Sequence, residues 1–232
     1  MTEVLKSAHF PTVRAWVEGW AISRATPGPV PEPWGLRVDV GLPGHVARHI
    51  VAAPTQEILH GLTARLTTPG TWLKLCAPAE SVAPCLPPGW TVKEPEFMMT
   101  VPLTRTLPLT RANRLNRPDR LNRAVPQAPP GYTLAVTTRA GVTVARLLTA
   151  AGEVAARGQY AMAGTTAVID KVETAAGHRR RGLGTVVMGT LAGTAASKGA
   201  STGILVATAQ GQALYRTLGW TLHTPMTAAV LT

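Results

Sequence analysis

The chain has 232 residues, which is enough for one large domain or two small ones with a buried core. A content of 45% hydrophobic and only 15% charged residues argues against a disordered chain, and no apolar run reaches the roughly 18–20 residues that a membrane span needs. The formal net charge of +11 suits a nucleic acid, an anionic surface or a polyphosphate cofactor as a partner.

The positive charge is spread along the chain. Residues 1–125 carry 14 basic and 9 acidic side chains, and residues 126–232 carry 9 and 3. No single tail therefore holds the excess. The carboxylates of the second half are Glu153, Asp170 and Glu173, and their scarcity makes each of them a candidate base.

Neither a targeting signal nor a metal site is predicted. Residues 1–6 lack the basic-then-apolar order of a signal peptide. Cys76 and Cys85 lack metal-ligand spacing, and the histidines form no convincing metal-ligand pattern. We expect a cytoplasmic protein with free thiols and no membrane partner, and a disulfide between the two cysteines stays open.

The first half is predicted to be α+β and contains no recognisable chemical motif. Trp16, Val17 and Trp20 recur at helical spacing and predict a helix over residues 9–20. Proline and glycine predict a loop over residues 26–35. Strands are expected at residues 36–40, 47–52, 71–75 and 96–101, and a helix that starts at Pro54 or Thr55 carries Leu59 and Leu62 on its apolar face.

A periodic run of arginines lies between the two halves. Every third position is basic in the series Arg111, Arg114, Arg117, Arg120 and Arg123. Pro118 forbids a regular helix across this run. A nucleic-acid arm and an exposed basic linker both fit the pattern. Because no aromatic residue interleaves to stack on bases, we favour a linker over residues 105–130.

From Gly131 onward, strand patterns predominate. Strands are predicted at residues 132–137, 143–148, 153–163, 165–172 and 202–207, with a closing strand or hairpin at 221–230. Residues 183–198 are predicted as a helix, because Val187, Met188 and Leu191 lie on one apolar stripe with Ala192 and Ala195. A shorter helix is expected at residues 212–218.

The loop that opens the longer helix is the most informative segment. Its sequence is Arg179-Arg180-Arg181-Gly182-Leu183-Gly184. A helix N-terminus presents backbone N–H groups to an anion, glycines let phosphate oxygens approach closely, and arginines bind phosphate in a bidentate way. No Lys-Ser or Lys-Thr pair follows, as a P-loop needs, and Val187 stands where a dinucleotide fingerprint has its third glycine. The segment therefore predicts a phosphate cradle of another kind.

Two motifs together carry a family resemblance. Arg179-x-x-Gly182-x-Gly184 follows a β-rich run, and Leu214-Tyr215-x-x-Leu218-Gly219-Trp220 comes about thirty residues later. In this order they resemble the signatures of the GNAT superfamily, the acyl-CoA-dependent N-acyltransferases, over roughly residues 131–230. The resemblance implies an α+β fold with a mixed sheet. It also implies direct attack of an amine on the thioester of acetyl-CoA, which lies between two splayed central strands, without a covalent enzyme intermediate.

The resemblance also assigns roles to residues. The backbone of Val172 and Thr174 would bind the pantetheine, the N–H groups of residues 180–185 would bind the pyrophosphate, and Tyr215 would protonate the departing thiolate. Thr208 stands where the family often has an asparagine. The implied cofactor-binding residues are Val172, Thr174, Arg179, Arg180, Arg181, Gly182, Leu183, Gly184, Thr185 and Thr208.

The general base is sought among the carboxylates of the preceding strand. Asp170 shares strand parity with Val168 and Val172, so these three side chains are expected on one face. Glu173 is expected on the other face unless a bulge re-aims it. Asp170 is therefore ranked ahead of Glu173, and a structural ion pair is an alternative for either residue.

One departure from the family pattern concerns the acceptor site. The family usually places two helices between its first two strands, and residues 138–141 leave room only for a turn. Either the first half supplies equivalent helices, or it is a degenerate second copy of the fold that covers the acceptor site. The predicted organisation is an α+β region at 1–104, a linker at 105–130 and a GNAT-like domain at 131–232.

The expected function is transfer of an acetyl group from acetyl-CoA to an amine of a small metabolite or amino-acid-like acceptor. Two alternatives stay open. An enzyme of the same fold could use a tRNA or protein partner, which the charge of +11 would suit. A module that binds acyl-CoA without turnover could serve regulation.

Overall fold

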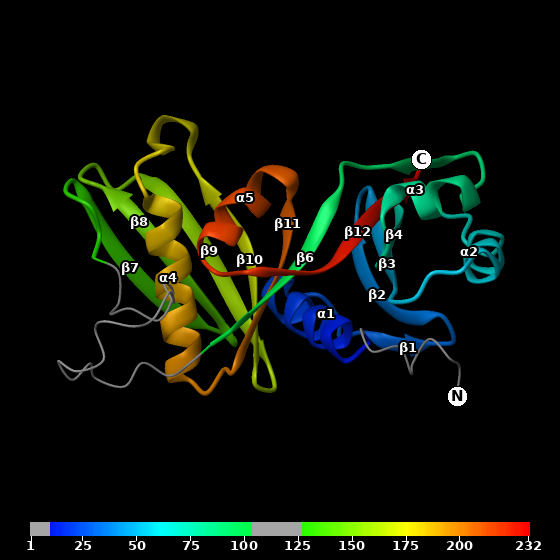
Figure 1. Cartoon of the computed structure of the whole chain (residues 1–232), viewed down its shortest axis with the longest axis horizontal. Helices are drawn as coiled ribbons and strands as arrows, with labels where there is room; N and C mark the ends of the chain where they lie inside the picture. Colours follow the sequence, from blue (N-terminus) through cyan, green and yellow to red (C-terminus); the bar gives the residue numbers. More distant parts are fainter. Residues whose placement is uncertain (1–9, 104–126) are drawn as a thin grey trace. The chain divides into compact units, whose positions relative to one another are not determined.

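The computed structural model describes residues 10–103 and 127–232, which form two compact units (Figure 1). Unit 1 consists of the described residues of Met1–Met99 together with Val206–Ala213 and Leu222–Thr232. Unit 2 consists of the described residues of Thr100–Leu205 together with Leu214–Thr221. The sequence grouped residues 131–232 in one domain, whereas the structure places two pieces of that stretch in unit 1. Most of the predicted linker, residues 105–130, lies outside the described residues.

Unit 1 is built on a sheet with strand order β1-β2-β3-β4-β12, and β5 pairs with β12. The strands are β1 (Val30–Glu32), β2 (Gly35–Leu42), β3 (His45–Val51), β4 (Thr71–Leu75), β5 (Trp90–Val92) and β12 (Thr221–Leu231). Neighbours are antiparallel except for β3 and β4, which are parallel and connected through α2 (Gln56–Thr63). The unit also contains α1 (Phe10–Arg24), α3 (Ala79–Val82) and the 3-10 turn Ala83–Cys85. Strand β6 (Glu96–Pro102) begins in unit 1 and ends in unit 2.

The apolar faces predicted for unit 1 meet in its core. The buried cluster comprises Val51, Leu59, Leu62, Leu73, Leu75, Val82 and Ala229. Leu59 and Leu62 come from the predicted apolar face of α2. In α1, Trp16, Val17 and Trp20 are all buried, as their helical spacing indicated.

The predicted loop at residues 26–35 contains a short strand, so the prediction was wrong there. Strand β1 pairs with β2 from Val30↔Arg37 to Glu32↔Gly35. Strand β1 lies at the end of the sheet, which explains why the proline and glycine content of residues 26–35 predicted a loop there. Pro31 lacks an N–H group and is tolerated in an edge strand, where no second neighbour needs that donor.

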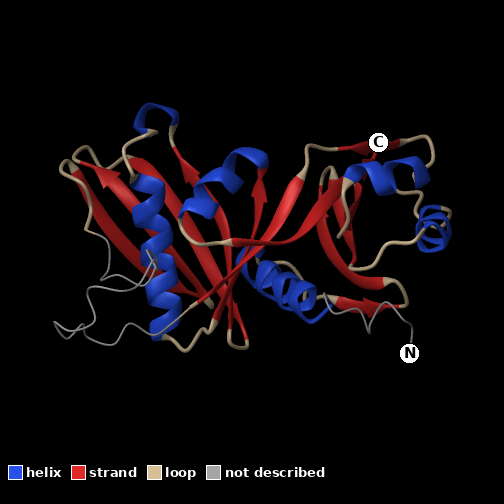
Figure 2. Ribbon diagram, viewed as in Figure 1, coloured by secondary structure: helices blue, strands red, loops and turns tan. Residues whose placement is uncertain are grey.

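Unit 2 has the strand order β7-β8-β9-β10-β11. These strands are β7 (Tyr132–Arg139), β8 (Val142–Thr149), β9 (Val154–Ala163), β10 (Thr166–Thr174) and β11 (Thr202–Thr208). The first four form antiparallel hairpins, whereas β10 and β11 are parallel and connected through the 3-10 turn η5 (Ala176–His178) and α4 (Leu183–Ser197). Helix α5 (Ala209–Thr217) follows β11, and both elements are divided between the units, because Val206–Ala213 belongs to unit 1. Figure 2 shows α4 lying along the strands of this unit.

Helix α4 packs closely on its sheet. The predicted stripe of Val187, Met188 and Leu191 is fully buried. Gly158 of β9 permits the close approach, because a Cβ placed there would lie 2.9 Å from Val187 Cγ1 and 3.0 Å from Leu191 Cδ1. The helix therefore lies against a position where a larger side chain does not fit. None of the described helices is long and apolar enough to cross a membrane.

The two units repeat one topology. Unit 1 runs through β2-β3-α2-β4-α3 and unit 2 through β9-β10-α4-β11-α5. Each series has an antiparallel pair, a parallel crossover through a helix, and a second helix after the crossover strand. Both explanations for the first half, a source of equivalent helices and a degenerate second copy of the fold, stay predictions.

Candidate active site

The loop between β10 and α4 has the geometry of an anion cradle. Arg180 and Gly182 both have left-handed backbone conformations, with φ of 63° and 76°. Left-handed residues in a turn direct successive N–H groups toward one point. The first hydrogen bond of α4 runs from Val186 N to Gly182 O, so the N–H groups of residues 183–185 have no acceptor within the helix. Gly182 is the N-cap and provides no capping side chain.

The corresponding helix of unit 1 begins differently. Thr55 is the N-cap of α2, and its Oγ1 accepts a hydrogen bond of 3.2 Å from Ile58 N. This side chain occupies the position at which an external anion would bind. The N-terminus of α4 is therefore available to a ligand, whereas that of α2 is closed by its own cap.

The parallel strands next to each helix also differ. In unit 1, β3 and β4 pair over five residues, from Ala47↔Thr71 to Val51↔Leu75. In unit 2, β10 and β11 pair over three, and the last pair is Val168↔Ile204. Strand β10 continues to Thr174, so its backbone from residue 169 onward is not engaged by the described ladder with β11. Backbone groups of β10 are thus left for a ligand, and both Val172 and Thr174 belong to this stretch.

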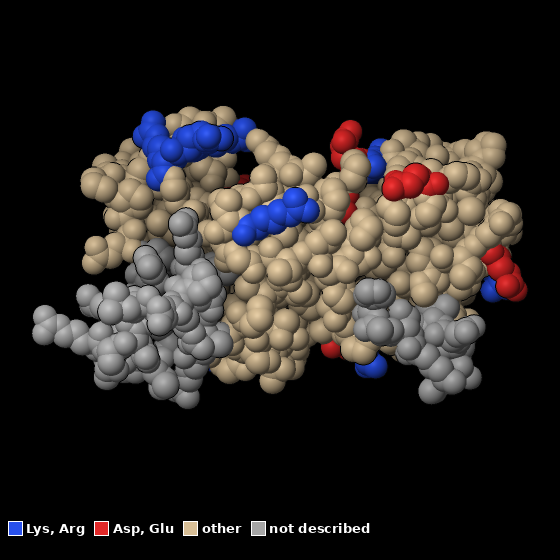
Figure 3. Space-filling model, viewed as in Figure 1, with Lys and Arg blue, Asp and Glu red and all other residues tan. Residues whose placement is uncertain are grey.

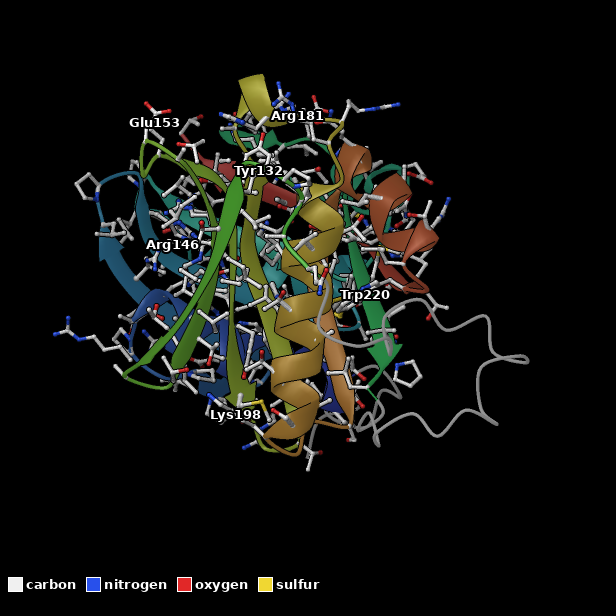
Figure 4. All side chains as sticks on the ribbon, turned by 90° about the vertical axis from the view of Figure 1, so that its left-hand side faces the viewer. Tyr132, Arg146, Glu153, Arg181, Lys198 and Trp220 are labelled. Carbon is white, nitrogen blue, oxygen red and sulfur yellow. The ribbon has the colours of Figure 1, made fainter. Side chains whose placement is uncertain are left out.

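Two residues that the sequence did not single out hold the cradle arginine. Arg181 Nη1 donates to Tyr132 Oη over 3.0 Å, and the same Oη lies 2.9 Å from His178 Nδ1. The Tyr132 and His178 rings meet edge to face, 5.7 Å apart. Figure 4 shows Tyr132 and Arg181 at the same end of unit 2. Because the contacts join residues 46 and 49 positions apart, local sequence patterns could not reveal them. Arg179 is fixed separately, by donation from Nε to Thr174 O over 3.3 Å.

Strand β10 contains a bulge between Asp170 and Glu173. Asp170 pairs with Gln159 and Glu173 with Arg157, so three steps on β10 match two on β9. Lys171 has a φ of 51° at this point, and its N–H donates to Asp170 Oδ1 over 2.8 Å. The extra residue reverses the alternation of side chains beyond it.

The bulge corrects the predicted faces. Val172 Cγ2 lies near Gly158 on the α4 side of the sheet, so Val172 does not share the face of Asp170 as its parity indicated. Glu173 instead lies on the same face as Asp170. Its Oε1 forms an ion pair with Arg157 Nε at 2.6 Å, which is the structural role weighed for this carboxylate.

Tyr215 lies within the electrostatic reach of Asp170. The tyrosine is 8% exposed, and its ring centroid is 6.2 Å from that of Trp220. Burial, and secondly the negative charge of Asp170, raise the pKa of Tyr215 to about 12. Its hydroxyl is therefore protonated at neutral pH and can donate a proton, as a general acid requires.

Two further predicted cofactor residues have local structural roles. Thr208 ends β11, and its Oγ1 accepts a hydrogen bond of 3.2 Å from Gly211 N in the first turn of α5. The hydroxyl thus caps α5. A Cβ placed on Gly184 would lie 3.2 Å from Leu214 Cδ2, so this glycine also serves close packing at the start of α4.

A pocket of about 230 Å³ lies beside the cradle. Its lining residues are Val154, Ala155, Ala156, Arg157, Glu173, Thr174, Ala175, Ala176 and Arg179. Two guanidinium groups and one carboxylate thus face a space with alanine walls. Within the described part of the chain, no group of three or more His, Cys, Asp or Glu side chains is placed to hold a metal ion. Cys76 and Cys85 are free thiols.

Comparisons with known proteins find a family similarity in the second half of the chain. Residues 117–220 match the family model described as acetyltransferase (GNAT) family. A GCN5-related N-acetyltransferase from Kribbella flavida has a similar structure, with a TM-score of 0.58 and 18% identity over 97% of this chain and 95% of that chain. A GCN5-related N-acetyltransferase-like protein from Streptococcus suis has a TM-score of 0.54 and 14% identity over 80% of both chains. At these identities the structures show the fold. No curated protein matches the chain.

Proposed function

We propose that the protein is an N-acetyltransferase that moves the acetyl group of acetyl-CoA to the amine of a small, amino-acid-like acceptor, in keeping with the match of residues 117–220 to the GNAT acetyltransferase family model. The observation that carries this proposal is the uncapped N-terminus of α4 next to a parallel strand pair that separates after three residues. The equivalent places in unit 1 are capped and fully paired, so the difference between the units supports a ligand in unit 2 alone.

The cradle fits a pyrophosphate. The N–H groups of residues 183–185 would bind its oxygens, and a Cβ placed on Gly182 would meet nothing within 4 Å, so the space around this residue is open. Arg181, held by Tyr132, would add a charge-assisted contact. The unpaired end of β10 would bind the amides of the pantetheine arm. When bound, acetyl-CoA supplies the thioester carbonyl that an amine can attack.

Proton transfer is assigned to two side chains. Asp170 is the preferred base that takes a proton from the acceptor ammonium, because its negative charge acts on Tyr215, the assigned acid. Tyr215 Oη holds the proton for the departing thiolate, and its pKa of about 12 keeps that proton in place at neutral pH. Overall, the acceptor ammonium gives up two protons as the C–N bond forms and the C–S bond breaks. Asp170 would take the first proton before the attack. Tyr215 would give its proton to the thiolate and regain one from the new amide nitrogen, so one proton is released through Asp170 in each turnover.

A macromolecular acceptor is the second candidate. Figure 3 shows Lys and Arg atoms gathered over the loop that precedes α4, on a chain with a net charge of +11. The cradle itself accounts for the arginines of this loop, which favours the small acceptor. Binding of tRNA that weakens steeply with salt would instead favour the second candidate, because phosphate contacts release counterions.

Calorimetric titration with CoA tests the proposal. We expect a one-to-one complex in which the ligand competes with acetyl-CoA. The complex should persist in Tyr215→Phe, since this hydroxyl is assigned to chemistry and not to binding. An absence of binding at millimolar CoA would contradict the proposed function.

A further inference from the structure

The face of the unit 2 sheet that bears Asp170 carries a row of three charges. Arg146 of β8 pairs directly with Arg157 of β9, which pairs directly with Glu173 of β10. Directly paired residues project from the same face of a sheet, and like charges in such a pair are destabilising. Glu173 neutralises Arg157 through their ion pair of 2.6 Å. The row therefore keeps two guanidinium groups and one carboxylate.

With Arg157 paired to Glu173, the remaining positive charge of the row is that of Arg146. Its Nη1 donates to the neutral Thr137 Oγ1 over a long distance of 3.4 Å, and among the described residues it forms no ion pair. Arg146 is half-buried, and Figure 4 shows it midway along the sheet. An unneutralised guanidinium that is partly removed from water, opposite a second one, is suited to an external anion.

The candidate base lies one row further along the same face. Asp170 pairs with Gln159, two residues from Arg157 along β9. At a rise of about 3.3 Å per residue, the two rows are about 7 Å apart. Arginine and aspartate side chains can reach across this distance to the carboxylate and amine of one amino-acid-sized molecule. The geometry thus matches an acceptor with a negative group close to its amine.

The pocket of about 230 Å³ and Asp170 lie on opposite sides of the charged row. Arg157 and Glu173 line it, and its alanine walls leave space for the remainder of an acceptor. A single carboxylate would restore neutrality to a row that carries one excess positive charge, whereas a phosphate monoester would overcompensate it.

We propose that Arg157, with Arg146 beside it, binds the carboxylate of an amino-acid-like acceptor whose amine faces Asp170. This subsite rests on the proposed acetyl transfer and specifies its acceptor class. Arg157 is then a specificity-determining residue. Glu173 competes with the acceptor for Arg157, so removal of its charge should strengthen the subsite and not weaken it.

Binding of two product-like probes tests the subsite without any turnover. N-acetylglycine carries a carboxylate, and N-acetylglycinamide is its neutral counterpart. In the presence of CoA, the full-length chain should bind the acid about tenfold or more tightly than the amide, the usual effect of a hydrogen bond to a charged group. Arg157→Gln should bring the two affinities within about twofold, and Glu173→Gln should increase the preference for the acid. NMR titration measures the affinity of each probe for the wild type and for each variant.

Arg139→Gln is the matched control, because it removes the same charge from the same sheet. Arg139 follows Thr138, whose hydroxyl accepts a hydrogen bond from Lys198 at the end of α4. Figure 4 shows Lys198 at the opposite end of this helix from Arg181. The preference for the acid should be unchanged in Arg139→Gln, and thermal unfolding should show that every variant is folded.

The outcomes separate the subsite from the acetyl-transfer function. Equal affinity for acid and amide in the wild type, or a preference that survives in Arg157→Gln, overturns the subsite even where CoA binds normally. A preference for the acid that depends on Arg157 supports the subsite, and an absence of CoA binding in the same titrations would contradict only the acetyl transfer.

Discussion

Gly182 provides a sharp test of the cradle, because the chain offers a matched control for the strain of substitution. Gly182 has a φ of 76° and Gly164, in the β9–β10 turn, a φ of 58°, and a Cβ at either position would meet nothing within 4 Å. Gly182→Val and Gly164→Val therefore impose similar backbone strain, and the Cβ of neither valine clashes with the protein. Since a left-handed conformation costs an L-residue about 1–2 kcal/mol, each variant should lose at least about that much stability.

The two variants should differ in CoA affinity. At residue 182, a branched side chain lies next to the N–H groups that would bind the pyrophosphate. Loss of one hydrogen bond to a charged group costs about 1.5–3 kcal/mol, so each lost contact should weaken CoA binding by about tenfold to hundredfold. Gly164→Val lies away from the cradle and should leave the affinity within about twofold of the wild type.

Calorimetry with CoA and thermal unfolding of the same samples measure both effects. Equal affinities for CoA in Gly182→Val and Gly164→Val would refute the assignment of the cradle. Parallel losses of stability in the two variants would show that the difference in affinity is not a consequence of partial unfolding.

Three other predictions concern Tyr215, His45 and Gly158. Tyr215→Phe should lower turnover by about 10²-fold at unchanged CoA affinity. Tyr160→Phe is the control, because it removes a buried hydroxyl that has no hydrogen-bond partner among the described residues, and it should not lower turnover. Equal steady-state rates in Tyr215→Phe and the wild type would show that Tyr215 has only a structural role. Burial lowers the pKa of His45 from 6.5 to about 4, so between these pH values the unfolded state binds more protons than the folded state. The contribution of His45 to the free energy of unfolding should be complete above pH 6.5 and should decrease as the pH falls toward 4. Denaturant unfolding at several pH values measures this, and the same pH dependence in His45→Gln as in the wild type would contradict it. Gly158→Ala should destabilise the protein by about 1–3 kcal/mol, because its Cβ would lie 2.9 Å from Val187 Cγ1, and an unchanged midpoint in urea would contradict the packing argument.

Local patterns were sufficient for the elements of the second half and for the backbone conformation at the start of α4. The buried stripe of α4 follows from the 3.6-residue period of Val187, Met188 and Leu191. The left-handed Gly182 follows from a glycine directly before that helix. The predicted cofactor and catalytic residues remain predictions, and Thr208 shows why a motif position alone is weak evidence, since its hydroxyl caps α5.

The features that depend on pairing partners could not be predicted from the sequence. The bulge in β10 exists only relative to β9, and it decides that Glu173 and not Val172 shares the face of Asp170. The contact between Tyr132 and Arg181 joins distant segments. The sequence did not reveal the repeated topology of the two units, because nothing in the first half repeats the arginine and glycine motif of the second. A second copy of the fold was therefore only one of two explanations.

The central claim is that this chain transfers an acetyl group from acetyl-CoA to an amine. The most direct measurement incubates the purified protein with acetyl-CoA and a panel of amino acids, and follows both free CoA and the mass of each amine. We expect at least one amino acid to gain an acetyl group in step with CoA release, at a rate that Tyr215→Phe reduces. CoA release without any acetylated amine, or no release in the presence of bound acetyl-CoA, would contradict the account.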